Sequence, residues 1–314
     1  MKPISRLQMW CGLVFLCGMV QLQALNVVVS IPPQAAFVKA VAADRANVQI
    51  LLEPGRSPEL YSPSARRMTE VSRADIYFAI GVPMENVLLP KLKSISPQLT
   101  IVNTIAKVPL RTMEEGHFHH DHGHDHAHHD HDADHDDDHK PFFAEDVSDL
   151  HGRDPHTWLS PKNAILQVES IAQALISLDP KHKDDYLANA NTYIAKLHSL
   201  DDELSAQLKP YAGKTIYVYH PSFGYFTDSY GLKQSAVETG GKAPSSRDLS
   251  RLIESARSDN ARIIFVQPQF PKRSAEVVAR SIRGKVMPLD GLAEDYAGSL
   301  RAMANAIEEA FKGE

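Results

Sequence analysis

Short apolar runs alternate with amphipathic stretches along the first third of the chain, and this pattern predicts strands and helices in turn. Runs rich in Val, Ile and Leu predict buried strands at residues 26–30, 48–52, 75–80 and 99–102. Stretches with helical spacing predict helices between them at 34–43, 63–71 and 85–92. Strands that alternate with helices favour a parallel sheet covered by helices on its faces.

The same alternation returns after Tyr211. Strands are predicted at residues 215–219, 234–237, 263–266 and 286–289. Helices are predicted at 225–230, 246–258, 272–282 and 294–311. The chain of 314 residues is long enough for two domains that each bury a core, and the pattern therefore predicts two α/β lobes.

Two long helical patterns lie between the predicted lobes. The first spans residues 161–178, with Ser160 as a natural N-cap and Pro161 as a natural first helical residue. The second spans residues 181–208, and its apolar side chains recur at helical spacing. A helix of that length would extend over ~42 Å, which exceeds what one small domain needs. We expect it to be shared by both lobes.

The N-terminus has the pattern of a secretory signal peptide. Lys2 and Arg6 precede an apolar run at residues 9–20, which is short for a membrane span, and Ala24 offers a small residue for cleavage. The residues before Cys17 lack the small side chains of a lipoprotein signal, so secretion without a lipid anchor is expected. The predicted organisation is a signal peptide (1–24), a first lobe (25–160) with a disordered loop (112–150), a helical connection (161–210) and a second lobe (211–314).

Composition restricts the chemistry of any metal site. Both cysteines, Cys11 and Cys17, lie in the predicted signal, so the secreted chain would have no thiol ligand and no disulfide. Loss of Lys2 and Arg6 takes the formal net charge from −6 to −8, and residues 112–139 alone carry ten acidic and no basic residues. The acidity therefore belongs to one segment, and nothing indicates nucleic-acid binding.

That acidic segment is also rich in histidine. Residues 117–139 contain eleven of the sixteen histidines among eight aspartates: His117, His119, His120, His122, His124, His126, His128, His129, His131, His135 and His139. Such a tract cannot bury a core and is expected to be disordered without metal. Closely spaced imidazoles suit Zn, Cu, Ni and Co, so the tract predicts auxiliary weak metal sites. A purification tag and a plain solvated charge run are the competing interpretations, and the internal position and the high histidine content count against them.

Four residues outside the tract are candidates for one defined metal site. His156 lies in the sequence DPHTWLSP directly after the tract, and His220 and Asp290 each follow a predicted strand of the second lobe. Glu59 follows a strand of the first lobe, in GRSPELYSP. The carboxyl ends of strands are where α/β folds place their ligand residues. Alone, His156 would more often be a structural histidine, Asp290 a turn aspartate and Glu59 an exposed loop residue. Trp158 and Tyr61, which lie beside these candidates, are expected to be packing residues.

Together these stretches resemble the periplasmic zinc- and manganese-binding proteins of ABC importers, the metal-specific cluster of solute-binding proteins. The resemblance covers residues 25–314 and rests on VVVSIPP, GRSPELYSP, the His-rich segment, DPHTWLSP, YVYHPSFGYF, IFVQPQF and PLDGLAEDY. It implies an α/β, two-lobed periplasmic solute-binding fold, with a parallel sheet flanked by helices in each lobe and one long joining helix. It also implies a metal ion between the lobes and delivery of that ion to a membrane permease. The resemblance implies no enzymatic activity. By position, His156 and His220 match two histidine ligands, and Asp290 matches the carboxylate ligand.

Glu59 departs from this resemblance, because the family pattern resembles G-x-D-P-H and Glu59 occupies the place of a histidine. Glutamate is a competent zinc ligand. Two imidazoles and two carboxylates would neutralise a divalent ion, and the harder donor set favours manganese somewhat more than three imidazoles would. The His-rich segment favours zinc, and we therefore predict Zn²⁺ as the transported ion, with Mn²⁺ as the alternative.

Two other classes of function remain open on the sequence alone. A secreted zinc hydrolase would need an open coordination position and a general base, and the sequence has no H-E-x-x-H or other hydrolase motif. A periplasmic metal buffer would act mainly through the His-rich segment, with the lobes as scaffold. We expect a monomeric binding protein whose partners are a divalent metal ion and an ABC permease.

Overall fold

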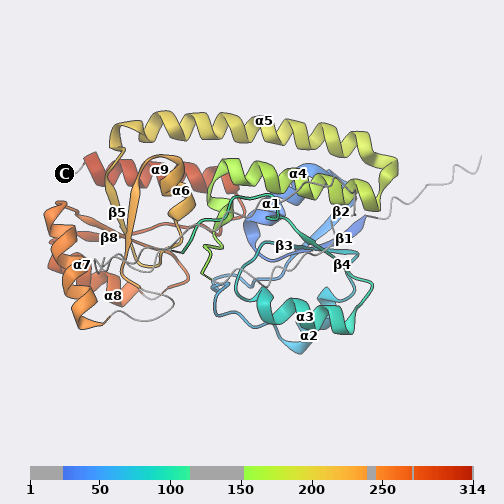
Figure 1. Cartoon of the computed structure of the whole chain (residues 1–314), viewed down its shortest axis with the longest axis horizontal. Helices are drawn as coiled ribbons and strands as arrows, with labels where there is room; N and C mark the ends of the chain where they lie inside the picture. The colour runs from blue at the N-terminus through green and yellow to red at the C-terminus, as the bar shows by residue number, and fades with distance from the viewer. Residues whose placement is uncertain (1–23, 114–151, 239–244, 271, 313–314) are drawn as a thin grey trace, which may run out of the picture.

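The structure is a computed structural model that describes residues 24–113, 152–238, 245–270 and 272–312. It has two lobes, each built on a four-stranded parallel sheet (Figure 1). The predicted signal peptide and the His-rich tract at 117–139 lie outside the described residues. Among the helices that are described, none is both long and apolar enough to cross a membrane.

The first sheet has the strand order β2-β1-β3-β4. Its strands are β1 (Leu25–Val29), β2 (Ala46–Ile50), β3 (Ile76–Ala79) and β4 (Thr100–Asn103). Its helices are α1 (Pro32–Ala42), α2 (Ala65–Val71) and α3 (Glu85–Ile95). The last three residues of β1 and all four residues of β3 are buried. These strands therefore form continuous apolar segments in the sequence, as strands covered on both faces do.

The second sheet repeats this topology in the order β6-β5-β7-β8. Its strands are β5 (Thr215–Val218), β6 (Lys233–Ala236), β7 (Ile263–Val266) and β8 (Lys285–Pro288). Its helices are α6 (Gly224–Ser229), α7 (Ser246–Ser258), α8 (Lys272–Ser281) and α9 (Tyr296–Lys312). Both sheets have the strand order of a doubly wound fold, in which ligands lie at the carboxyl edge where the order reverses.

The two lobes share a helical layer formed by α4 (Pro161–Leu178), α5 (Lys183–Leu208) and α9. Helix α5 runs along the length of the molecule over both lobes (Figure 1), and it packs against α1 and α4 at one end and α9 at the other. Its 26 residues extend over ~39 Å. It buries one stripe of side chains: Tyr186, Ala190, Leu197, Leu200, Leu204 and Leu208. One continuous hydrophobic core therefore joins the lobes along this layer, and the expectation of a long shared helix is confirmed.

Several helix boundaries differ from the sequence prediction by a few residues. Helix α2 begins at Ala65 rather than Pro63, because Ser64 has extended backbone angles and its hydroxyl accepts a hydrogen bond from the Arg67 amide. Helix α4 begins at Pro161 as expected, but Ser160 does not cap it through its side chain. The Ser160 hydroxyl instead accepts a hydrogen bond from Ser229 in α6, which attaches the start of α4 to the second lobe.

Candidate metal centre

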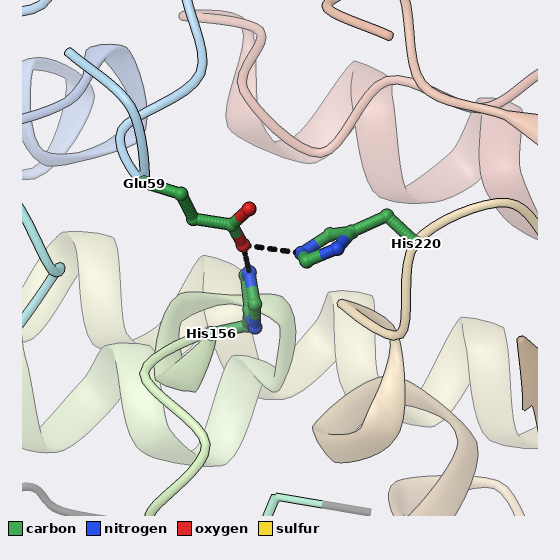
Figure 2. Close-up of side chains that lie close together, drawn as sticks. All are labelled: Glu59, His156 and His220. Carbon is green, nitrogen blue, oxygen red and sulfur yellow. Dashed lines mark ion pairs between the residues drawn. The ribbon is translucent and has the colours of Figure 1, made fainter. Parts of the chain in front are cut away.

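Three side chains from distant parts of the chain converge between the lobes: Glu59, His156 and His220 (Figure 2). Glu59 lies in the loop after β2, His156 in the turn before α4, and His220 shortly after β5. Each offers one ligand atom, and these atoms all lie within 4.8 Å of one another. Both imidazoles are buried, and the Glu59 side chain is 16% exposed.

The Glu59 loop is held by a compact turn and by the start of α3. The carbonyl of Ser57 accepts hydrogen bonds from the amides of Leu60 and Tyr61, at 3.3 and 3.1 Å. The carbonyl of Pro58 accepts another from the Met84 amide at 3.1 Å. These backbone contacts direct the Glu59 carboxylate toward the second lobe. Leu60 points away and is 82% exposed.

Asp154 orients His156. One carboxylate oxygen, Oδ1, accepts hydrogen bonds from His156 Nδ1 at 2.7 Å and from the His156 amide at 3.0 Å. Because a carboxylate only accepts, Nδ1 carries the proton and Nε2 presents its lone pair to the site. The other oxygen of Asp154 accepts from Arg111 at 3.0 Å, and the Asp154 side chain is fully buried.

Glu238 has the same relation to His220. Its Oε2 lies 3.0 Å from His220 Nδ1, which leaves Nε2 directed toward Glu59. The His220 ring stacks on Phe270 with a centroid separation of 4.9 Å, and its backbone carbonyl accepts from Gln267 at 2.9 Å. A metal-binding histidine whose second nitrogen donates to a carboxylate has a fixed tautomer and a more basic ligand nitrogen. Both histidines therefore have the supporting contacts of metal ligands.

The spacing of the three donors suits a small divalent ion. Glu59 Oε1 lies 2.5 Å from His220 Nε2 and 3.8 Å from His156 Nε2. Tetrahedral zinc with ligand distances near 2.0–2.1 Å separates its donors by about 3.3 Å, so shifts below ~1 Å would form the site. The His220 Nε2 atom is buried and has no well-directed hydrogen-bond partner. The Glu59 carboxylate faces this nitrogen at 2.5 Å, so both donor atoms are directed at the same point between the lobes.

Electrostatics favour a cation at this position. Burial alone would raise the pKa of Glu59, but His220 and His156 outweigh it, and the pKa of Glu59 is lowered. The pKa of Asp154 is also lowered, because the hydrogen bonds from His156 and Arg111 outweigh its burial. Burial alone would lower the pKa of His220. Its contacts with Glu238 and Glu59 outweigh burial and raise the pKa to about 9. In the metal-free protein, a proton on His220 therefore neutralises part of the negative charge.

A small cavity of about 30 Å³ lies beside the three donors, and Trp158 forms part of its wall. The Trp158 ring is 1% exposed and lies 5.3 Å from the His156 ring. Its indole N–H donates to the Gly291 carbonyl at 2.7 Å, which attaches the turn that carries His156 to the second lobe. Trp158 is therefore a packing residue, as expected, and Tyr61 is half-buried against the core.

The structure does not bring Asp290 into the group of three. Its Oδ1 accepts a hydrogen bond from the Leu292 amide at 2.9 Å, so the carboxylate caps its own turn. Asp290 lines a neighbouring groove of about 770 Å³ between the lobes, together with Glu53, Arg56 and Arg67. Its role as a fourth ligand stays a prediction.

Sequence reasoning missed Asp154 and Glu238, the two carboxylates behind the histidines. Both had a signal in the sequence. Asp154 lies two residues before His156 in DPH, and Glu238 follows the strand predicted at residues 234–237, where β6 ends near the carboxyl edge of the sheet.

The fold and the site define a two-lobed metal-binding protein of the solute-binding class. The sequence model of the family described as "Zinc-uptake complex component A periplasmic" (ZnuA) matches residues 27–310. The chain belongs to this family, as the resemblance indicated. The two-lobed fold is likewise confirmed, because a crystal structure of ZnuA superposes with a TM-score of 0.78 at 30% identity and covers 92% of this chain and 99% of that one.

Two kinds of curated relative match most of the chain. The high-affinity zinc uptake system protein ZnuA of Brucella abortus is 30% identical over an alignment of 303 positions that covers 90% of this chain and 91% of that protein. The zinc-binding lipoprotein AdcA of Streptococcus pneumoniae is 30% identical over an alignment of 323 positions that covers 99% of this chain. The chain spans only 60% of the length of AdcA. A deletion mutant of ZnuA with zinc bound has also been solved, and it has the same TM-score of 0.78 to this chain.

Proposed function

We propose that this chain captures Zn²⁺ between its lobes and delivers it to the membrane permease of an ABC importer. The observation that supports this most is the pairing of two buried imidazoles with a carboxylate, in which each imidazole is oriented from behind by its own buried carboxylate. The relatives named for zinc uptake and zinc binding support the choice of ion.

We place Glu59, His156 and His220 on the ion as three ligands. Asp290 is our candidate for the fourth, because its turn is continuous with the wall of the cavity through Gly291 and Leu292. To reach the ion, the Asp290 carboxylate would have to give up its hydrogen bond to the Leu292 amide. A water molecule in the fourth position is the alternative outcome.

The types of donor atom in the site bear on the choice between zinc and manganese. Two imidazoles and one carboxylate match the nitrogen and oxygen donors of zinc, and manganese prefers more oxygen donors and a higher coordination number. Among the residues that the structure describes, three donors lie together, and this donor set favours zinc. Manganese binding would require Asp290 and further oxygen donors.

The family to which the chain belongs supplies components of transport systems. We therefore propose a binding protein without catalytic activity, located in the periplasm and acting as a monomer, with the permease as its partner. The auxiliary role of the histidines at 117–139 belongs to this proposal as well, as loosely binding sites that collect zinc for the defined one.

Metal titration of a variant that lacks residues 117–139 tests the proposal. Calorimetry should find one tight zinc site per chain, and manganese should bind more weakly in competition. If no tight site survives the deletion, the chain acts as a buffer through its His-rich segment. If a tight manganese site is found instead, the transported ion is manganese.

A further inference from the structure

One arginine outside the metal centre contacts three separate parts of the molecule. Arg111 follows β4, the last strand of the first sheet, and its side chain is only 14% exposed. Its Nη1 donates to Asp154 at 3.0 Å, and its Nε lies 3.0 Å from the carboxylate of Asp228 in α6 of the second lobe. The guanidinium therefore lies between the turn that carries His156 and the second lobe.

Tyr225 of α6 completes this contact from the other side. Its hydroxyl accepts a hydrogen bond from the Arg111 amide at 3.1 Å and donates to the Asp154 carbonyl at 3.0 Å. The guanidinium carbon also lies 5.9 Å from the centre of the Tyr225 ring. Both the backbone and the side chain of Arg111 are thus fixed relative to Asp154.

Gly224 leaves the space that the guanidinium occupies. A Cβ atom added at Gly224 would lie 1.5 Å from Arg111 Nη1 and 2.8 Å from Asp154 Oδ2. Neither atom could stay in place next to an alanine. A glycine at position 224, four residues after His220, is therefore required for the Arg111 guanidinium to lie where it does.

We propose that Arg111 is a positioning residue for the metal centre: it holds Asp154, and through Asp154 it holds His156 with Nε2 directed at the ion. The chain of contacts runs from Asp228 and Tyr225 of the second lobe through Arg111 to Asp154 and then to His156. It fixes one histidine ligand relative to the segment that carries the other. This inference rests on the proposed function, because it assumes that His156 binds the metal.

The direction of the effect separates positioning from simple charge. Arg111 carries a positive charge close to a site for a cation, so its removal would strengthen metal binding if charge alone acted. Loss of the positioning contact weakens binding, typically about 10–100-fold for a partner behind a metal ligand. The two explanations therefore predict changes of opposite sign.

Arg111→Met in the full-length chain tests the inference, with zinc affinity measured against a chelator strong enough to strip weaker sites. We expect affinity to fall about 10–100-fold, with a shift in the visible absorption of the Co²⁺-substituted protein, because the His156 ligand is reoriented. Arg111→Lys should restore part of the affinity. Arg153→Met is the matched control, because Arg153 is exposed and its described contact is the Leu110 carbonyl at 3.4 Å. Its affinity and spectrum should equal those of the parent.

Two further variants keep the test decisive if Arg111→Met folds poorly. Gly224→Ala should weaken zinc binding by displacing the guanidinium, and it should add little to the effect of Arg111→Met. In an Asp154→Asn background, the loss of Arg111 should also add little, since interacting residues are not additive. Unchanged or tighter zinc binding in both Arg111→Met and Gly224→Ala would overturn the inference. If the parent protein itself binds no zinc tightly, the proposed function fails rather than this inference.

Discussion

Replacement of Glu59 by alanine removes the proposed ligand that lies in the loop after β2. Three donor atoms lie within 4.8 Å of one another, and this variant leaves two. Loss of a partner behind a ligand weakens metal binding by about 10–100-fold, so loss of a direct donor should exceed that range. The corresponding cost is more than about 2.8 kcal/mol, since each tenfold change is 1.4 kcal/mol.

Proton competition at His220 partly masks this loss near neutral pH. Because contact with Glu59 helps to raise the pKa of His220 to about 9, the alanine variant should have a lower pKa there and less competition from the proton. The measurement should therefore be made at pH 7 and again above pH 9. The difference between parent and variant should be larger at the higher pH, where the proton competes less for His220 of the parent.

The assay is a competition titration with a zinc chelator in the variant that lacks residues 117–139. Glu59→Gln is the matched control, because it keeps the shape of the side chain and removes its charge. Glu59→His should retain zinc binding and shift the preference away from manganese, since imidazole is a softer donor than carboxylate. If Glu59→Ala binds zinc as tightly as its parent at both pH values, Glu59 is not a ligand and the reasoning is refuted.

Four further outcomes follow from the same geometry. Zinc should change the emission of Trp158, because its ring lies 5.3 Å from that of His156; a constant emission with binding confirmed would place the ion elsewhere. Zinc binding at pH 7 should release about one proton, because the raised pKa of His220 leaves its imidazole protonated in the metal-free protein; calorimetry in buffers of different ionisation enthalpy measures this number. The raised pKa of His220 stabilises the metal-free fold, fully below pH ~6.5, and this stabilisation is lost as the pH rises through about 9. Zinc affinity should therefore increase between these pH values, and a pH-independent affinity would contradict the assignment. Glu238→Gln should weaken zinc binding about 10–100-fold, and a loss of stability without a loss of zinc affinity would make Glu238 structural.

The alternation of strands and helices was sufficient to predict the two sheets and the long helix. Strands such as Ile76–Ala79 are buried along their whole length, and a fully buried strand leaves a continuous apolar run in the sequence. Helix ends were less predictable. Ser62 and Ser64 are equally plausible caps by residue type, and only the backbone conformation at Ser64 decides between them.

The sequence predicted His156, His220 and Glu59 as site residues, because they follow strands or lie in a recognisable motif, and their binding of metal stays a prediction. The structure brings those three together and leaves Asp290 aside. Position after a strand places a carboxylate at the correct edge of the sheet, but it does not determine where the side chain points. The hydrogen bond from the Leu292 amide, formed within the turn itself, turns the Asp290 carboxylate toward its own backbone.

The carboxylates behind the histidines had positional signals in the sequence, but the sequence alone did not pair them with the histidines. Asp154 bonds His156 directly, two residues away, and is held by Arg111, 43 residues away in the chain. Glu238 reaches His220 across 18 residues that include α6 and β6, so the fold is what reveals this pair.

The most direct test of the central claim is a crystal structure of the zinc-loaded protein with the ion located by anomalous scattering. One zinc peak should lie between the lobes, about 2.0–2.2 Å from His156 Nε2, His220 Nε2 and a Glu59 carboxylate oxygen. The same map shows whether Asp290 or water completes the coordination. A tightly bound zinc ion that lies away from His156 and His220 would contradict the claim.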